Sequence, residues 1–491
     1  MEREETPLLL DSGDVREDAQ EKNNSSASII EDAIDTLHLA APIFISRVSY
    51  TGMKTTDTAL LGHVSGEALS AAALSDLWTM CWGVFIQGGA LSILVGQCVG
   101  ADNLNLAFVY LRISYFVLGL TSIGVMVSWC YTEQIWVMLG QSRDIAKDAG
   151  YYSSVFVISI PAQLAFGQMS QFLSAQRIMQ PEVTTSMIAL GVNLLLGCIF
   201  VLGFSIPGFN GLGFKACPIV TVAVVWIQSI VLWTFFRDFL KNHSKRDEAT
   251  QKRSFVSSMI DGITFDRIRT FSALYFPAAL SLASDFWRMG LIGAIAATLG
   301  EREVGLFNAS YRILWITLIF VGAVSAASGI KIGLKLGRGH SMAARQAALV
   351  GISLVIVCLI ALAMLVYYNT RLFGMIFTND ESYLDLFEEC RLPFTASLFF
   401  MNLAVGIEAI PISMGRTGSV FYCSLFASWL GQVPGVLLLT KYWRNDLYAL
   451  WSGIAIGYCA LVFLYAGLVL NSDWKKYSDI ARKRVEVSEE N

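Results

Sequence analysis

Apolar runs long enough to cross a lipid bilayer recur along almost the whole of this chain. A helix needs about 20 residues to cross a hydrocarbon core roughly 30 Å thick, and short polar turns separate windows of that length here. The windows lie near 34–54, 71–97, 106–130, 149–172, 184–204, 217–236, 270–299, 306–330, 346–369, 391–412, 418–440 and 447–470. Only 15% of the 491 residues are charged, against about 25% in a soluble domain. The pattern predicts an all-α, multi-pass membrane protein with about twelve transmembrane helices.

Polar stretches divide the chain into two halves. Residues 1–33 are acidic and polar and lack the basic start and apolar core of a secretory signal, so we expect a disordered cytosolic tail. The other predicted divisions are an N-lobe at 34–236, a linker at 237–269, a C-lobe at 270–470 and a C-terminal tail at 471–491. Lysine and arginine collect in the linker and in the C-terminal tail. The positive-inside bias therefore predicts that the linker and both termini face the cytosol.

A short motif repeats between the two halves. Gly96-Gln-Cys-Val-Gly100 ends the second predicted span of the first half, and Gly333-Leu-Lys-Leu-Gly337 ends the corresponding span of the second half. Because small residues four apart let helices approach closely, we expect no bulky residue to be tolerated at these glycines. Internal repetition of a membrane bundle is typical of secondary transporters, in which substrate lies between two halves that rock to alternate access.

Few acidic residues lie within the predicted spans. An ionisable group at membrane depth is costly unless it faces protein or water, so each such acid is a candidate for function. The main candidates for binding and releasing a proton or a sodium ion are Asp57, Asp285 and Glu408. Glu408 lies near the end of its span, close to Pro411, so it could instead reach water.

The acids also have structural interpretations. The spacing allows an i,i+3 ion pair between Lys54 and Asp57, and another between Asp285 and Arg288. Asp76, in the second span, is expected nearer the surface. The sequence alone leaves both interpretations open for each acid.

Neutral polar residues in the fourth and fifth spans, among them Gln163 and Asn193, each need a partner in lipid and could line a polar cavity. The motifs HExxH and GxSxG and a phosphate-binding P-loop are absent from the sequence. The nine cysteines are scattered, with no histidine at ligand spacing, so no metal site is predicted. We therefore expect neither an enzyme nor a cofactor, and transport driven by an ion gradient.

Several segments resemble motifs of the multidrug and toxic compound extrusion (MATE) family of antiporters, over nearly all of residues 34–470. Thr56-Asp57-Thr-Ala-Leu-Leu-Gly62 resembles the family's Asp-Thr-x-x-x-Gly, and residues 96–101 resemble its Gln-x-x-Gly-Ala. Residues 172–181 resemble Leu-Gln-Ala-Gln followed by Pro, and residues 324–339 resemble the matching second-half motif. The residues expected to form the structural framework are Gly62, Gly96, Gly100, Pro161, Gln176, Pro181, Gly333 and Gly337.

The resemblance implies a V-shaped pair of six-helix lobes related by pseudo-two-fold symmetry, with cation sites inside the lobes and substrate in the cleft between them. It places Asp57 at the family's N-lobe acid, Asn193 at a polar position of the fifth span, and Asp285 where eukaryotic members usually have Glu. The family's tenth-span acid is expected at Leu403. Either Glu408 substitutes for that acid from one turn further along, or the site is lost.

The resulting prediction is a secondary active antiporter that exports small organic compounds, namely organic cations, xenobiotics or metabolites, in exchange for protons or sodium. We expect a monomer in a vacuolar, other endomembrane or plasma membrane that does not bind nucleic acid. One alternative is a lipid-linked saccharide flippase of the same superfamily, which would need a basic cleft formed by Arg47, Arg288 and Arg312. The other is a membrane-embedded transferase, which would need a His-Asp pair at membrane depth.

Overall fold

The computed structural model describes residues 25–87, 89–204, 209–244, 262–377 and 380–486, and these are helical with no β-strand. The helices of the first half are α2 (Ser25–Val64), α3 (Gly66–Gln87), α4 (Ala90–Gly100), α5 (Leu104–Cys130), α6 (Thr132–Met138), α7 (Arg143–Val157), α8 (Ile160–Ala175), α9 (Gln180–Phe200) and α10 (Ala216–Ser244). The helices of the second half are α12 (Phe265–Leu299), α13 (Glu301–Gly337), α14 (Ser341–Tyr368), α15 (Thr370–Met375), α16 (Glu381–Glu389), α17 (Arg391–Ser413), α18 (Thr417–Leu425), α19 (Val433–Tyr442), α20 (Leu447–Leu470) and α21 (Trp474–Glu486). A π-helix, Phe426–Gln432, joins α18 to α19.

Within the described residues, nine helical stretches are long and apolar enough to cross a membrane, and the bent pair α7–α8 makes a tenth when it is counted as one span. The other two predicted spans correspond to α2 and α12, which are 40 and 35 residues long. Polar residues interrupt their apolar runs, including Lys54 and Asp57 in α2 and Asp285 and Arg288 in α12. The first helix of each half is therefore the polar one, and it carries one candidate acid of that half, Asp57 in α2 and Asp285 in α12.

The ends of the predicted segments differ from the helix ends. Helix α2 begins at Ser25, so residues 25–33 are helical although the sequence predicts a disordered tail there. Helix α10 extends to Ser244 and α12 begins at Phe265, which shortens the stretch between them. Much of the C-terminal tail forms α21. The rest of the predicted tails and the centre of the linker, at 1–24, 245–261 and 487–491, lie outside the described residues.

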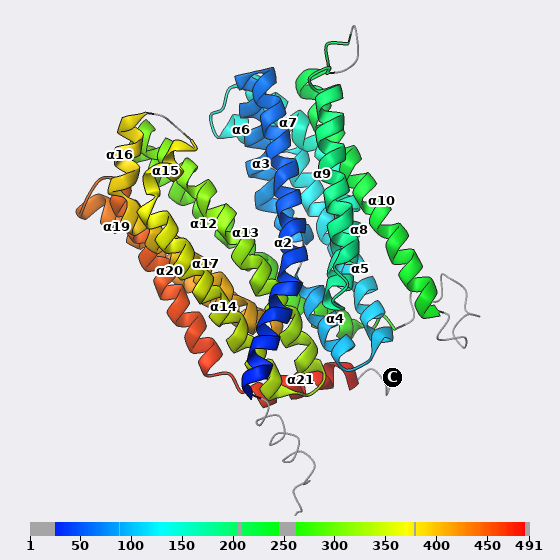
Figure 1. The fold of residues 1–491 in the computed structure, drawn as a ribbon. Helices are drawn as coiled ribbons and strands as arrows, with labels where there is room; N and C mark the ends of the chain where they lie inside the picture. The colour runs from blue at the N-terminus through cyan, green and yellow to red at the C-terminus, as the bar shows by residue number, and fades with distance from the viewer. Residues whose placement is uncertain (1–24, 88, 205–208, 245–261, 378–379, 487–491) are drawn as a thin grey trace, which may run out of the picture.

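The helices form two lobes that converge at one end and separate toward the other (Figure 1). The first helix of each half packs on both halves: α2 packs on α9 of its own half and on α13 of the second, and α12 packs on α18 of its own half and on α3 and α5 of the first. Leu39 and Ala40 of α2 join the core of the C-lobe, and Phe271 and Tyr275 of α12 join a core of the N-lobe. This reciprocal packing is the pseudo-two-fold arrangement expected of a repeated bundle.

The repeated glycines lie at the seam between the lobes, where α4 packs on α13. A Cβ added at Gly100 would lie 3.0 Å from the Gly337 Cα, and one added at Gly337 would lie 2.9 Å from the Gln97 Cα. Gly96 and Gly333 have more room, since an added Cβ would come no closer than 3.8 Å to any neighbour. Backbone therefore meets backbone at the C-terminal end of the motif, as small-residue packing predicts.

Ionic and polar contacts tie the lobes together at the same end. Lys331 of α13 is buried and donates to the Thr36 hydroxyl at 3.1 Å, and it pairs with Asp32 and Asp35 of α2 at 3.1 and 3.0 Å. Helix α21 crosses the seam: its Ala481 belongs to a C-lobe core, and its Val485 belongs to an N-lobe core. The helix carrying the predicted positive C-terminal charges thus closes the converging end of the molecule (Figure 1).

Candidate functional site

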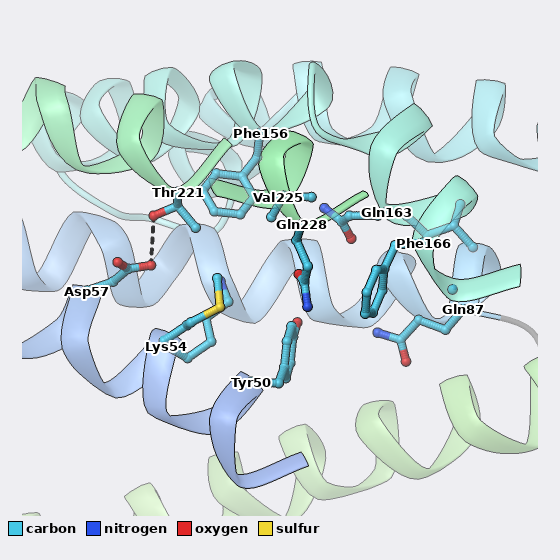
Figure 2. Close-up of a pocket in the computed structure, with 13 residues that line it drawn as sticks. Tyr50, Lys54, Asp57, Gln87, Phe156, Gln163, Phe166, Thr221, Val225 and Gln228 are labelled. Atoms are coloured by element: carbon cyan, nitrogen blue, oxygen red, sulfur yellow. Dashed lines mark hydrogen bonds between the residues drawn. The ribbon is translucent and has the colours of Figure 1, made fainter. Parts of the chain in front are cut away.

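A cavity of about 250 Å³ lies inside the N-lobe, between α2, α8 and α10 (Figure 2). Aromatic side chains and glutamine amides form much of its wall, with one basic and one acidic residue. Its lining residues are Tyr50, Met53, Lys54, Asp57, Ile86, Gln87, Phe156, Gln163, Phe166, Gly167, Thr221, Val225 and Gln228. The cavity therefore offers both π-faces and hydrogen-bonding groups to a small ligand.

Asp57 lies in the wall of this cavity and is only 4% exposed. The Asn193 Nδ2 of α9 donates to its Oδ1 at 3.1 Å, and the Thr221 hydroxyl of α10 donates to its Oδ2 at 2.9 Å (Figure 2 shows the second bond). Each carboxylate oxygen thus has a donor from a different helix. The Asn193 Oδ1 is buried and has no hydrogen-bond partner within the described chain. The structure thus brings together Asp57 and Asn193, which the sequence analysis selected separately.

Lys54 does not form the ion pair with Asp57 that its i,i+3 spacing allows. Its Nζ lies 2.9 Å from the Asp76 Oδ1, so α2 and α3 are joined by an ion pair. The same ammonium lies 4.7 Å from the centre of the Phe156 ring, within the range of a cation–π contact. Asp76 is therefore the partner of Lys54, and Asp57 forms no ion pair within the described part of the chain.

The C-lobe holds a second polar cluster, built around Arg288 of α12. This arginine is 1% exposed and pairs with Asp285 at 3.1 Å, which is the i,i+3 pair that the sequence allows. It also donates to the Tyr458 hydroxyl of α20 at 3.0 Å and to the Ser428 hydroxyl. Ser428 lies in the π-helix, and such irregular turns frequently occur at functional sites in helices.

Glu408 of α17 lies within electrostatic range of both Asp285 and Arg288. It is half-buried and makes no hydrogen bond or ion pair with the described residues. The two acids that the sequence analysis selected in the second half thus share one site. Leu403, where the resemblance places the family's tenth-span acid, is a buried core residue.

The remaining predicted residues lie at several places. Gln163 lines the N-lobe cavity and donates to the Ser159 hydroxyl at 2.7 Å. Arg312 is exposed on α13 and lies in neither cluster. Arg47 approaches Gly322 of α13 across the lobes. Since Arg288 is buried and already paired, these three arginines do not form the open basic cleft that a flippase would need.

The framework residues also differ in role. Pro161 and Pro181 lie in the first turns of α8 and α9, where a missing N–H costs no helical hydrogen bond. The Gln176 amide donates to the Phe172 carbonyl at 3.0 Å and so closes the end of α8. Gly62 lies inside α2, and a Cβ added there would meet nothing within 4 Å.

Sequence reasoning missed three contributors: Thr221, Tyr458 and Ser428. The hydroxyl of a serine or threonine in an apolar helix can bond its own backbone and so gives no signal of a distant partner. Thr221 does so as well, since its hydroxyl oxygen lies 3.1 Å from the Cys217 carbonyl oxygen.

Among the described residues no three His, Cys, Asp or Glu side chains are placed to hold a metal ion together.

Comparisons with known proteins agree on one family. The MatE family model matches residues 42–199 and 277–437. Protein DETOXIFICATION 14 of Arabidopsis thaliana is 22% identical over 471 residues, which cover 95% of this chain and 94% of the relative. Multidrug and toxin extrusion protein 1 of Danio rerio is 23% identical, with 92% and 75% of the two chains covered.

Solved structures of transporters have the same fold. The crystal structure of the eukaryotic MATE transporter AtDTX14 superposes with a TM-score of 0.82 at 20% identity, covering 93% of this chain and 99% of that one. A Vibrio cholerae MATE transporter superposes with a TM-score of 0.78 at 14% identity, covering 92% and 100%. Both matches extend over nearly the whole molecule, lobes and seam together.

Proposed function

This chain belongs to the multidrug and toxic compound extrusion family, and on that premise we propose that it exports small organic compounds from the cytosol in exchange for protons or sodium ions. It is a multi-pass membrane transporter and not an enzyme. The substrates of the proposed reaction are organic cations, xenobiotics or metabolites. Rocking of the two lobes about their seam would expose the space between them to each side of the membrane in turn.

One observation carries the proposal: a buried carboxylate, Asp57, lies in the wall of a cavity and forms no ion pair with any residue that the structure describes. A lone carboxylate at membrane depth is costly as an anion, so it favours the uptake of a proton or another small cation. The cavity beside it has aromatic walls that suit a flat or cationic organic molecule. Coupling follows if the cation and the organic molecule favour opposite orientations of the lobes.

We assign the coupling to Asp57 in the N-lobe and to Asp285 and Glu408 in the C-lobe, with Asn193 and Gln163 as polar groups of the N-lobe cavity. The converging end of the lobes carries α21 and the start of α2, and positive charge collects in the C-terminal segment. We therefore place this end in the cytosol, so that the lobes separate toward the opposite side. With this orientation, the proposed transport removes substrate from the cytosol whether the chain lies in a vacuolar or a plasma membrane. We also propose that a single chain is sufficient for transport.

The test is transport by the purified chain in proteoliposomes. Ethidium, a fluorescent organic cation, is supplied on one side, and a proton or sodium gradient is imposed in the opposite direction. We expect ethidium to accumulate against its own gradient with one of the two ions, and Asp57→Asn to abolish that accumulation. If ethidium flux through the wild-type chain depends on neither the proton nor the sodium gradient, the proposed antiport is refuted.

A further inference from the structure

Each lobe contains a cluster of one basic and two acidic residues. In the N-lobe these are Lys54, Asp57 and Asp76, and in the C-lobe they are Arg288, Asp285 and Glu408. In both lobes the base lies on the first helix of its half, on α2 or on α12. In both it pairs with only one of the two acids.

In the N-lobe the paired acid is Asp76, at 2.9 Å from the Lys54 ammonium. The free acid is Asp57, whose two oxygens accept hydrogen bonds from neutral groups on α9 and α10. Besides Lys54 and Asp76, the described titratable groups that interact electrostatically with Asp57 are Tyr152 of α7 and Cys217 of α10, whose hydroxyl oxygen and sulfur lie 3.7 Å apart. Neither is a base, so Lys54 is the positive charge that balances the acids of this site.

In the C-lobe the paired acid is Asp285, at 3.1 Å from the Arg288 guanidinium. The free acid is Glu408, which has no ion pair or hydrogen bond with the described residues. Tyr458 and Tyr465 of α20 are the other titratable groups that interact with it. Arg288 is held by Tyr458 and Ser428 as well as by Asp285, so its position is fixed from three helical segments.

We propose that Lys54 and Arg288 are fixed internal counter-ions, each of which keeps one acid of its lobe neutralised and leaves Asp57 and Glu408 as the two exchangeable cation sites. The inference rests on the proposed antiport and narrows it, since Asp285 then takes no part in exchange. A paired acid and base carry no net charge and need no mobile cation. The remaining carboxylate takes one monovalent cation, which changes the charge of its cluster from negative to neutral.

The counter-ions also limit the number of cations. Without its base a cluster would hold two carboxylates and would need a second cation to become neutral. Without the paired acid, the base would be free to pair with the exchangeable acid and displace its cation. Removing base and paired acid together leaves the charge of the lobe unchanged. The double variant therefore separates a counter-ion pair from an exchange site.

The experiment counts cations bound by the full chain purified in detergent. Protons are counted with a pH-sensitive dye in lightly buffered solution after a shift from mildly alkaline to mildly acidic pH, and sodium is counted with radioactive sodium. Each variant is compared with the wild type, so that unchanged surface groups cancel. Polar replacements keep hydrogen bonding: Lys54→Gln with Asp76→Asn in the N-lobe, and Arg288→Gln with Asp285→Asn in the C-lobe. Thermal unfolding confirms that each variant is folded.

We expect Asp57→Asn and Glu408→Gln each to bind one cation fewer than the wild type, and both double variants to bind the same number. The single variants Lys54→Gln and Arg288→Gln should each bind one cation more. A double variant that loses a cation would overturn the inference, because the paired acid would then be an exchange site. The inference would also be overturned if Lys54→Gln or Arg288→Gln bound the same number of cations as the wild type. The N-lobe pair is about one-third exposed, so its variants give the result even if the C-lobe variants fail to fold.

The two proposals fail differently. If Asp57→Asn and Glu408→Gln leave the count unchanged and wild-type transport ignores both gradients, the antiport itself is wrong. If transport is driven by a gradient but a double variant loses a cation, only the counter-ion inference is wrong.

Discussion

Replacing Gly100 by alanine should shift the equilibrium between the two orientations of the lobes. The added Cβ would lie 3.0 Å from the Gly337 Cα and overlap the Leu334 carbonyl oxygen. These neighbours are backbone atoms of α13 and cannot turn aside as a side chain can. Overpacking typically costs 1–3 kcal/mol, and rigid neighbours place the cost at about 2–3 kcal/mol. The conformation with this seam closed should therefore become about 30- to 150-fold less populated relative to one with the seam open.

The assay measures the distance between the separated ends of the lobes. Spin labels are attached at Met138→Cys of α6 and Leu372→Cys of α15, in a background without the native cysteines. Both side chains are well exposed, at 85% and 62%. Double electron–electron resonance then measures the distance between the two labels. Opening the seam should bring these ends together, so Gly100→Ala should add a shorter distance that the wild type lacks. Gly337→Ala should do the same, because its Cβ would meet the Gln97 backbone.

Gly96→Ala is the matched control, since it lies on the same helix one turn earlier and its Cβ would come no closer than 3.8 Å to any atom. It should leave both the distance distribution and transport unchanged. The reasoning is refuted if Gly100→Ala matches the wild type, or if Gly96→Ala shifts the distances equally.

Three further predictions concern Asp57, Lys331 and Lys475. Asp57→Asn should abolish gradient-driven ethidium transport while the melting temperature stays close to that of the wild type, since amide and carboxylate are alike in size; normal transport in proteoliposomes would contradict this. Lys331→Met should destabilise the chain by about 2–3 kcal/mol in denaturant unfolding, because a buried, charged hydrogen-bond donor is lost, whereas Lys335→Met, which is more exposed, should cost less than about 1 kcal/mol; equal losses would argue against a buried network. A cysteine at Lys475 should react with an impermeant maleimide only after the cytosolic face is opened, and labelling from the outside would reverse the proposed orientation.

Much of the fold could be predicted from the sequence, because the bilayer imposes strong local constraints. A helical span satisfies its backbone hydrogen bonds internally and is usually a long apolar run, so most windows of apolar residues correspond to observed helices. The glycine repeat likewise indicates close helix packing, although the sequence does not identify the partner helix. The same reasoning identified Asp57, Asp285 and Glu408, since acids within apolar runs are rare enough to stand out.

Only the tertiary structure decided which charges meet. Lys54 and Asp57 have the same i,i+3 spacing as Asp285 and Arg288, yet only the second pair forms. The reason lies on neighbouring helices: α3 presents Asp76 to Lys54, while α9 and α10 present an amide and a hydroxyl to Asp57. Spacing along one helix fixes which side chains share a face. Which of them pair depends on the donors and charges that the other helices bring to that face, and these come from positions up to 164 residues away in the sequence.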